Sequence, residues 1–229
     1  GRATATYVRR LLPMRPIVIV DHPAAADQLA SVAAEVGSCV ALPIDVTEMN
    51  AGNAIAAAGA DVNGFGMVIH AAGITRDKTL AKMDAATHWR PVIDVNLAAV
   101  AAIDAALLAA PSALAPAGAG FVSFGSTSGV AGNAGQSNYA CAKAGLMGYA
   151  KAMGQASAVH RFSCVAPGFI VTEMTRKMPF LTRTIGAKLN SLGQGGAPED
   201  VAAAVAFLAS PQAAGLAPGN VLRVCGQFV

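Results

Sequence analysis

The segment Gly66-Met67-Val68-Ile69-His70-Ala71-Ala72-Gly73 sets the architecture, because an apolar run passes directly into three small residues. Residues 66–70 predict a buried strand, and residues 85–110 predict a long alanine-rich helix with Pro91 near its start. Residues 120–124 form a second apolar run and predict another strand. Strand, helix and strand in this order predict a right-handed crossover between parallel strands.

The same alternation continues in both directions along the chain. Further strands are predicted at 16–21, 38–44, 162–166 and 220–224, and further helices at 24–36, 137–157 and 199–209. Strands that are apolar at nearly every position are typical of a parallel sheet covered on both faces. The sequence therefore predicts an α/β fold with a doubly wound, Rossmann-like parallel sheet in one domain.

Composition excludes several classes of protein. Of 229 residues, 54% are apolar and 13% are charged, which excludes intrinsic disorder. The net charge of +3 is scattered and forms no basic stripe, so no nucleic-acid partner is expected. The most apolar run, 95–110, contains Asn96 and Asp104 and therefore predicts a buried helix, not a membrane span. No secretory signal is apparent at the start of the sequence.

Four cysteines lie far apart in apolar stretches, at Cys39, Cys141, Cys164 and Cys225. This spacing predicts free buried thiols in a reducing compartment, hence a cytoplasmic protein, and it predicts no metal site.

Ligands of open parallel sheets bind outside the carboxyl ends of the strands. The polar residues and the segment at predicted strand ends are therefore the candidates for function: Asp21, Asp45, His70, Ser126 and the residues after Pro167.

Tyr139 and Lys143 are four residues apart on a predicted helix, so their side chains share one face. Ser126 lies thirteen residues before the tyrosine, just past a strand end. Reduction of a carbonyl needs an acid for the forming alkoxide, and a nearby lysine lowers the pKa of a phenol toward neutrality. A serine hydroxyl holds the carbonyl oxygen. A bare Tyr-x-x-x-Lys match is more often a surface pair, but Ser126 in register reverses that preference.

Longer stretches carry a family resemblance. They are His70-Ala71-Ala72-Gly73-Ile74-Thr75-Arg76-Asp77, Val95-Asn96-Leu97, Gly135-Gln136-Ser137-Asn138-Tyr139, Val165-Ala166-Pro167-Gly168-Phe169-Ile170-Val171-Thr172 and Gly219-Asn220-Val221-Leu222-Arg223-Val224. Nearly the whole chain resembles the short-chain dehydrogenase/reductase family, and within it the 3-oxoacyl-acyl-carrier-protein reductases. Leu189-Asn190-Ser191-Leu192 and the ending most resemble the larger ketoacyl reductases of high-GC bacteria, which carry an additional N-terminal flavodoxin-like domain.

This resemblance implies a catalytic role for four residues. Tyr139 would be the acid, Lys143 would lower its pKa and hold the cofactor ribose, and Ser126 would position the carbonyl. Asn96 would hold the water of a proton relay at a kink in the long helix. The alternative for Asn96 is a helix-interior side chain bonded to a backbone carbonyl.

The resemblance also implies a set of residues that bind a nicotinamide dinucleotide. Thr172 would meet the nicotinamide carboxamide, Ala71-Ala72-Gly73 would admit the adenosine ribose, and Asp45 with Val46 would contact the adenine. The family usually has Asn-Asn-Ala-Gly where this chain has His70-Ala71-Ala72-Gly73. The full set comprises Gly1, Asp21, Asp45, Val46, Ala71, Ala72, Gly73, Tyr139, Lys143, Pro167, Gly168, Ile170 and Thr172.

Asp21 bears on which dinucleotide is used. A carboxylate at that strand end accepts bonds from both ribose hydroxyls and repels a 2′-phosphate, which favours NADH over NADPH. Arg15 and His22 are close in sequence and leave NADPH as the alternative. Asp21 could also serve only as the N-cap of the following helix.

The glycine-rich phosphate loop of the family has no full match here. Sliding the family pattern along the sequence places Gly1 on the second motif glycine and Ala3 on the third. We therefore expect residues 1–229 to be a single reductase domain that is incomplete at its N-terminus, with a gap where the family places its central first strand.

The expected substrate is a 3-oxoacyl thioester carried by acyl carrier protein or coenzyme A. Basic residues at the expected mouth could meet such a carrier: Arg76, Lys78, Arg176, Lys177 and Arg183. Residues 174–193 resemble the family's substrate lid. Two other hypotheses remain open at this point, a non-catalytic scaffold of the same fold and another short-chain alcohol dehydrogenase. The apolar helices 85–110 and 137–157 predict a homo-oligomer, a tetramer by resemblance.

Overall fold

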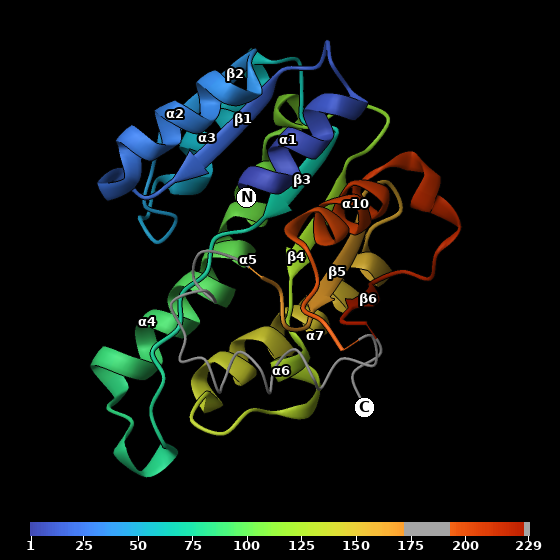
Figure 1. The fold of residues 1–229 in the computed structure, drawn as a ribbon. Coiled ribbons are helices and arrows are strands. Elements are labelled where there is room, and N and C mark those ends of the chain that lie inside the picture. Colours follow the sequence, from blue (N-terminus) through green and yellow to red (C-terminus); the bar gives the residue numbers. More distant parts are fainter. Residues whose placement is uncertain (172–192, 227–229) are drawn as a thin grey trace.

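The computed structural model describes residues 1–171 and 193–226 (Figure 1). Its elements are α1 Arg2–Leu11, β1 Ile17–Asp21, η1 Pro23–Ala25, α2 Ala26–Val36, β2 Cys39–Pro43, α3 Ala51–Asp61, β3 Met67–His70, η2 Leu80–Lys82, η3 Ala85–Trp89, α4 Arg90–Ile93, η4 Asp94–Ala98, α5 Ala99–Ala109, η5 Pro111–Ala113, β4 Gly120–Phe124, α6 Thr127–Ala131, α7 Ser137–Ala156, β5 Arg161–Pro167, α10 Pro198–Ala209, η6 Pro211–Gly215 and β6 Asn220–Val224.

All six predicted strands are present, and every strand end falls within one residue of its predicted place. Three α-helices among the described residues were not predicted: α1, α3 and the five-residue α6. Helix α1 begins at Arg2 and includes Ala3, which the sequence comparison aligns with the third glycine of the phosphate loop, so this segment is a helix and not a turn. Gly1 directly precedes the helix.

The strands form two parallel sheets. β1 pairs with β2, and the second sheet has the order β3-β4-β5-β6. No ladder joins β1 to β3 in the described part of the chain, so the gap expected at the centre of the sheet is present. The α/β fold class with a Rossmann-like arrangement is confirmed.

Alternation along β4 explains how the four-stranded sheet is covered. Phe121 packs with Ile103 and Leu107 of α5 and with Ile55 of α3. The next residue, Val122, faces the opposite side with Val165 and the buried residues of α10. Successive strand residues point to opposite faces, so each face carries its own apolar core. Helices α3, α5 and α7 cover one face, and α1 and α10 pack together on the other (Figure 1).

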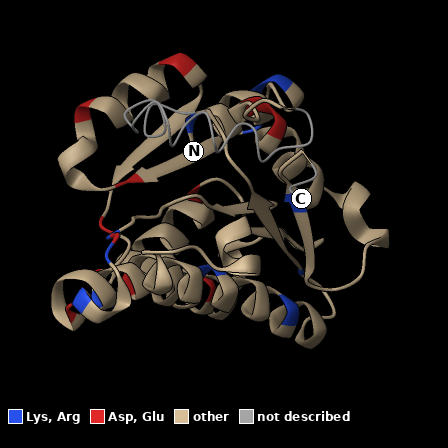
Figure 2. Cartoon of the chain, turned by 60° about the horizontal axis from the view of Figure 1, so that its bottom comes forward, with Lys and Arg blue, Asp and Glu red and all other residues tan. Residues whose placement is uncertain are grey.

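The helical stretch 85–109 is long and apolar enough to cross a membrane by length and composition alone. One side of it packs in the interior instead, where Asn96 and Asp104 are 0% and 1% exposed. That burial fits the predicted core helix. Lys and Arg are dispersed over the described elements without forming a stripe (Figure 2).

The prediction that all four cysteines are buried is wrong for one of them. Cys164 and Cys225 are buried and Cys39 is half-buried, but Cys141 is exposed on α7. Apolar neighbours in sequence do not decide burial on a helix, because only one side of α7 faces the sheet.

Candidate active site

Parallel pairing brings the carboxyl ends of the strands to shared edges of the two sheets. Asp21 ends β1, His70 ends β3, and Pro167 ends β5. Ser126 follows β4 by two residues. These residues therefore stand at or just past the carboxyl ends of their strands, Asp21 in one sheet and the other three in the second.

Ser126 and Tyr139 meet at the start of α6 and α7. Ser126 is the N-cap of α6, and its Oγ accepts a hydrogen bond from the Ser128 backbone N at 3.1 Å. The Ser126 side chain also lies close enough to the Tyr139 phenol to lower its pKa. Gly129 allows the two helices to approach, since a Cβ there would lie 2.8 Å from the Ala144 backbone N. Two hydroxyls thus share one point at the edge of the sheet.

Lys143 lies beneath the tyrosine and is 4% exposed. Its Nζ donates to the Phe124 carbonyl oxygen at 2.7 Å and lies 5.5 Å from the centroid of the Tyr139 ring. Burial lowers the pKa of Lys143 to about 8, against a smaller opposite effect of Cys164. Lys143 therefore remains mostly protonated at neutral pH but loses its proton at a lower pH than a free lysine does.

The pKa of Tyr139 differs from our expectation. Burial raises it, the nearby Ser126 side chain lowers it, and the Asp77 carboxylate raises it further. Lys143 was expected to lower this pKa. In the structure its ammonium is directed to the Phe124 carbonyl, so burial has the larger effect.

Asn96 lies in η4, where the long helix is wound as a π-helix, and its side chain is fully buried. Its Nδ2 donates to the Val92 carbonyl at 2.8 Å and to the Ile74 carbonyl at 2.9 Å. The amide nitrogen of Asn96 therefore bonds to backbone carbonyls, as the alternative role predicted. Its Oδ1 is buried and has no hydrogen-bond partner among the described residues.

Gly73 lies directly against Asn96. A Cβ at Gly73 would come within 2.7 Å of Asn96 Oδ1 and 3.6 Å of Lys143 Nζ. Three parts of the chain therefore meet beside Gly73: the segment Ala71–Gly73, the π-helical turn that carries Asn96, and Lys143. Unpaired buried oxygens are rare in proteins, and they require an explanation such as an ordered water or a ligand.

Sequence reasoning quoted Asn138 only as part of a motif and missed its role. The side chain is fully buried. Its Nδ2 donates to the Arg76 and His88 carbonyls at 3.0 and 2.7 Å, and its Oδ1 accepts from the Tyr139 backbone N at 2.8 Å. Asn138 therefore ties the segment after Gly73 to the first turn of α7. The signal in the sequence is a polar amide side chain directly before the tyrosine.

At the ends of β1 and β2 the acidic residues are engaged locally. Asp21 is exposed, and its Oδ1 accepts from the His22 backbone N at 2.8 Å. The capping side chain of the following helix is that of His22, so the N-cap alternative for Asp21 is wrong. Asp45 Oδ1 accepts from the Thr47 backbone N and hydroxyl, and these bonds lower the pKa of Asp45. His22 Nε2 lies 3.5 Å from Asp45 Oδ2.

Other residues of the expected cofactor set are spread along the same edge. Gly1 precedes α1 and interacts electrostatically with Asp21. Val46 packs against the core beside α3 and α5. Gly168 packs against Cys225, the residue after β6, since an added Cβ at Gly168 would lie 2.6 Å from the Cys225 Cβ. Ile170 pairs with Gly196 in a parallel bridge. Thr172 and nearly all of the expected lid 174–193 lie outside the described residues.

A family model matches most of the chain, from just before β1 to just after β6. A model described as enoyl-(acyl carrier protein) reductase matches residues 15–226. The chain belongs to the short-chain dehydrogenase/reductase family.

Among individual relatives, a 3-oxoacyl-[acyl-carrier-protein] reductase of Chlamydia muridarum is 40% identical over 162 residues, 70% of this chain and 64% of the relative. The enzyme of the same name from Vibrio cholerae is 38% identical over 168 residues, 72% of this chain and 67% of the relative. Nodulation protein G of a Rhizobium species is 33% identical over 223 residues, 96% of this chain and 89% of the relative. The chain spans about two thirds of the length of these two reductases.

Proposed function

We propose that this protein reduces the C3 ketone of a 3-oxoacyl thioester to the 3-hydroxyacyl thioester with a reduced nicotinamide dinucleotide. The observation that carries the proposal is the placement of Ser126 beside the Tyr139 phenol, with the buried Lys143 Nζ 5.5 Å from the centroid of the Tyr139 ring. The names of the relatives from Chlamydia and Vibrio support the same reaction.

The protein's own residues would handle the oxygen and its proton. The Ser126 hydroxyl donates to the ketone oxygen and holds it near the phenol of Tyr139. Tyr139 transfers its proton to that oxygen as the C–O π bond becomes an alcohol. A protonated Lys143 behind the ring would favour the tyrosinate left behind, while burial of the phenol acts in the opposite direction. The dinucleotide supplies the hydride that adds to C3.

The residues present fit a dinucleotide at this edge. Ala71–Gly73 expose backbone beside the unpaired Asn96 Oδ1, with no side chain larger than a methyl group. Asp21 is exposed at the end of β1, where it can accept from ribose hydroxyls. The N-terminus of α1, a helix of ten residues, supplies free backbone N–H groups for a pyrophosphate. Pro167, Gly168 and Ile170 complete the edge after β5.

The test is turnover of acetoacetyl-CoA by the full-length protein and by its Tyr139→Phe variant. Loss of the general acid should lower kcat by ~10²–10⁴-fold while the fold is retained. Tyr7→Phe on α1 is the matched control, since it removes another phenol from the same chain and should leave kcat unchanged. A Tyr139→Phe variant within a few-fold of wild type would refute the assignment.

A second candidate reaction is reduction of an enoyl thioester, because the family model is described as an enoyl reductase. That reaction delivers the proton to carbon, whereas Ser126 and Tyr139 form a pair suited to a carbonyl oxygen. Crotonyl-CoA should therefore be reduced far more slowly than acetoacetyl-CoA. The reverse order of rates would favour the enoyl reaction, and no reduction of either would favour a scaffold or a different alcohol substrate.

We also propose that NADH is preferred to NADPH. The exposed Asp21 carboxylate would repel a 2′-phosphate, and His22 is drawn toward Asp45 at 3.5 Å, away from a role in neutralising that phosphate. Asp21→Ala should narrow the preference. Asp61→Ala, at the exposed end of α3, controls for the change in net charge. Equal or faster turnover of NADPH by the wild type would overturn this assignment.

Two further parts of the proposal concern the acyl carrier and the cellular location. Arg76 and Lys78 are exposed beside the segment that Asn138 holds, and they could meet an acidic carrier protein or a phosphopantetheine arm. Four free thiols, one of them exposed, support a cytoplasmic location. Competition by apo and acylated carrier protein against acetoacetyl-CoA would separate the two carriers.

A further inference from the structure

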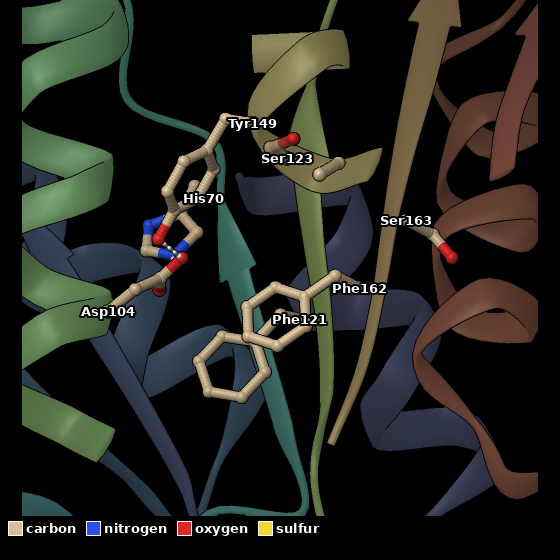
Figure 3. Close-up of a pocket in the computed structure, with 8 residues that line it drawn as sticks. His70, Asp104, Phe121, Ser123, Tyr149, Phe162 and Ser163 are labelled. Carbon is tan, nitrogen blue, oxygen red and sulfur yellow. Dashed lines mark hydrogen bonds and ion pairs between the residues drawn. The ribbon is translucent and has the colours of Figure 1, made fainter. Parts of the chain in front are cut away.

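A buried polar cluster lies behind the candidate active site and takes no part in the proposed chemistry. His70 Nε2 and Asp104 Oδ1 are 2.7 Å apart, and the Tyr149 hydroxyl donates to Asp104 Oδ2 at 3.0 Å (Figure 3). The side chains of His70 and Asp104 are 9% and 1% exposed. Both oxygens of a carboxylate in the interior are thus engaged by two different elements.

The three members come from the three elements that carry the site. His70 ends β3 and is followed at once by Ala71–Gly73. Asp104 is on α5, which continues the π-helical turn of Asn96. Tyr149 is on α7, six residues after Lys143. A change in any of the three contacts would therefore shift the segments that converge beside Gly73.

A small cavity adjoins the cluster. It has a volume of about 10 Å³ and is bounded in part by Phe121, Ser123 and Phe162 (Figure 3). That volume approaches the space needed for one water molecule. The Ser123 hydroxyl is buried without a hydrogen-bond partner among the described residues. The region is therefore polar and closely packed, with little room for the three side chains to rearrange.

Stability alone does not account for such a cluster. Replacing buried ionic groups with apolar side chains of similar volume is often neutral or stabilising, whereas removing one partner is costly. Buried polar clusters contribute more where the fold must favour one arrangement of its segments over others. Burial, and then Asp104, raise the pKa of Tyr149, so the phenol stays protonated and remains a donor. His70 also stands where the family usually has asparagine, so the family's own contacts at this strand end are replaced.

We propose that His70, Asp104 and Tyr149 are positioning residues that hold the Ala71–Gly73 backbone against Asn96 and Lys143, and thereby set the affinity for the dinucleotide. The inference rests on the proposed function for its second part, because Ala71–Gly73 is the segment assigned to the adenosine ribose. The first part, a fixed backbone, is testable without any activity.

The test compares Asp104→Leu with Asp104→Asn in the full-length protein. Leucine is close in shape but loses both contacts. Asparagine can accept from Tyr149 and can donate to His70 Nε2 when the imidazole carries its proton on Nδ1, so Asp104→Asn should preserve both contacts. We expect Asp104→Leu to speed amide hydrogen exchange at Ala71–Gly73 and to raise the Kd for NADH by about tenfold, or ~1.4 kcal/mol. The kcat should change much less, and Asp104→Asn should stay near wild type in all three.

Val205→Ala is the matched control, because it opens a buried site on α10 on the other face of the sheet. It should lower Tm without changing the Kd or the exchange of Ala71–Gly73. Tyr149→Phe removes one contact and provides a milder variant if Asp104→Leu does not fold.

Three results would overturn the inference: unchanged exchange at Ala71–Gly73 in both Asp104→Leu and Tyr149→Phe, an equal rise in Kd for Val205→Ala, or no rescue by Asp104→Asn. If the wild type binds no dinucleotide, the proposed function fails together with the affinity part, while the exchange measurement still decides whether the cluster fixes the backbone.

Discussion

Gly73→Ala is a single-methyl test of whether the site is closely packed around Asn96. The added Cβ would lie 2.7 Å from Asn96 Oδ1, well inside normal contact. Asn96 cannot easily retreat, because its side chain is fully buried and its Nδ2 is bonded to the Val92 and Ile74 carbonyls. Lys143 Nζ, 3.6 Å from the same Cβ, limits movement in another direction.

The expected cost follows from this geometry. Inserting a methyl group into a well-packed site costs about 1–3 kcal/mol, because neighbours move or leave their preferred rotamers. For a domain of this size each kcal/mol lowers Tm by roughly 2–4 °C, so Gly73→Ala should lower Tm by roughly 2–12 °C. The same methyl group occupies the space assigned to the dinucleotide, so affinity for NADH should fall as well.

The assay is thermal unfolding by circular dichroism, followed by calorimetric titration of NADH. Gly66→Ala is the control, since a Cβ at Gly66 meets nothing within 4 Å and the residue begins the same segment of chain. It should be neutral or slightly stabilising, because alanine reduces the entropy of the unfolded chain. A Gly73→Ala protein as stable as Gly66→Ala, with unchanged affinity, would refute the packing argument.

Three further predictions concern charge, a turn and assembly. Burial lowers the pKa of Lys143 from 10.5 to about 8, so the unfolded chain binds this proton more tightly and wild-type stability should rise between about pH 8 and 10.5. In urea unfolding curves Lys143→Met should flatten that rise, and an identical rise in both proteins would contradict the lowered pKa. Arg9 donates to six backbone carbonyls around the ends of α1 and α2. Arg9→Lys should therefore lower the free energy of unfolding by about 1–3 kcal/mol, whereas Arg10→Lys, at an exposed position, should not. The exposed positions of α5 are alanines, and those of the first half of α7 are small (Cys141, Ala144 and Gly148), so light scattering should show an oligomer. A stable monomer at micromolar concentration would be evidence against self-association through these helices.

The strands could be predicted because their signal is local. Runs such as 120–124, which is apolar except for Ser123, are followed by glycine or proline, and the predicted ends lie within one residue of the observed ones. Helices α1 and α3 were missed because their sequences do not show the same contrast. α1 is polar apart from a narrow stripe, and α3 is mostly alanine and glycine without a side-chain cap.

Within the site, the residue types could be predicted but their contacts could not. Spacing placed Tyr139 and Lys143 on one face, yet the bond from Lys143 to the Phe124 carbonyl depends on how α7 packs on β4. His70 and Asp104 are separated by 34 positions, and nothing local pairs them. Long-range partners and burial decide the pKa values, so the direction of the Tyr139 shift could not be derived from its neighbours in sequence.

The separation of β1 from β3 has a consequence for how the molecule opens. β1 and β2 hydrogen-bond to each other but not to the four-stranded sheet, and α2 packs on this pair. Cooperative units in proteins often coincide with supersecondary motifs whose backbone bonds close on themselves. Residues 17–43 therefore form a candidate sub-global unfolding unit that can open while β3–β6 stay closed. Asp21 and Asp45 would lie on one side of that division, and the backbone after His70 would lie on the other. A ligand that contacts both sides would therefore couple the two units into one.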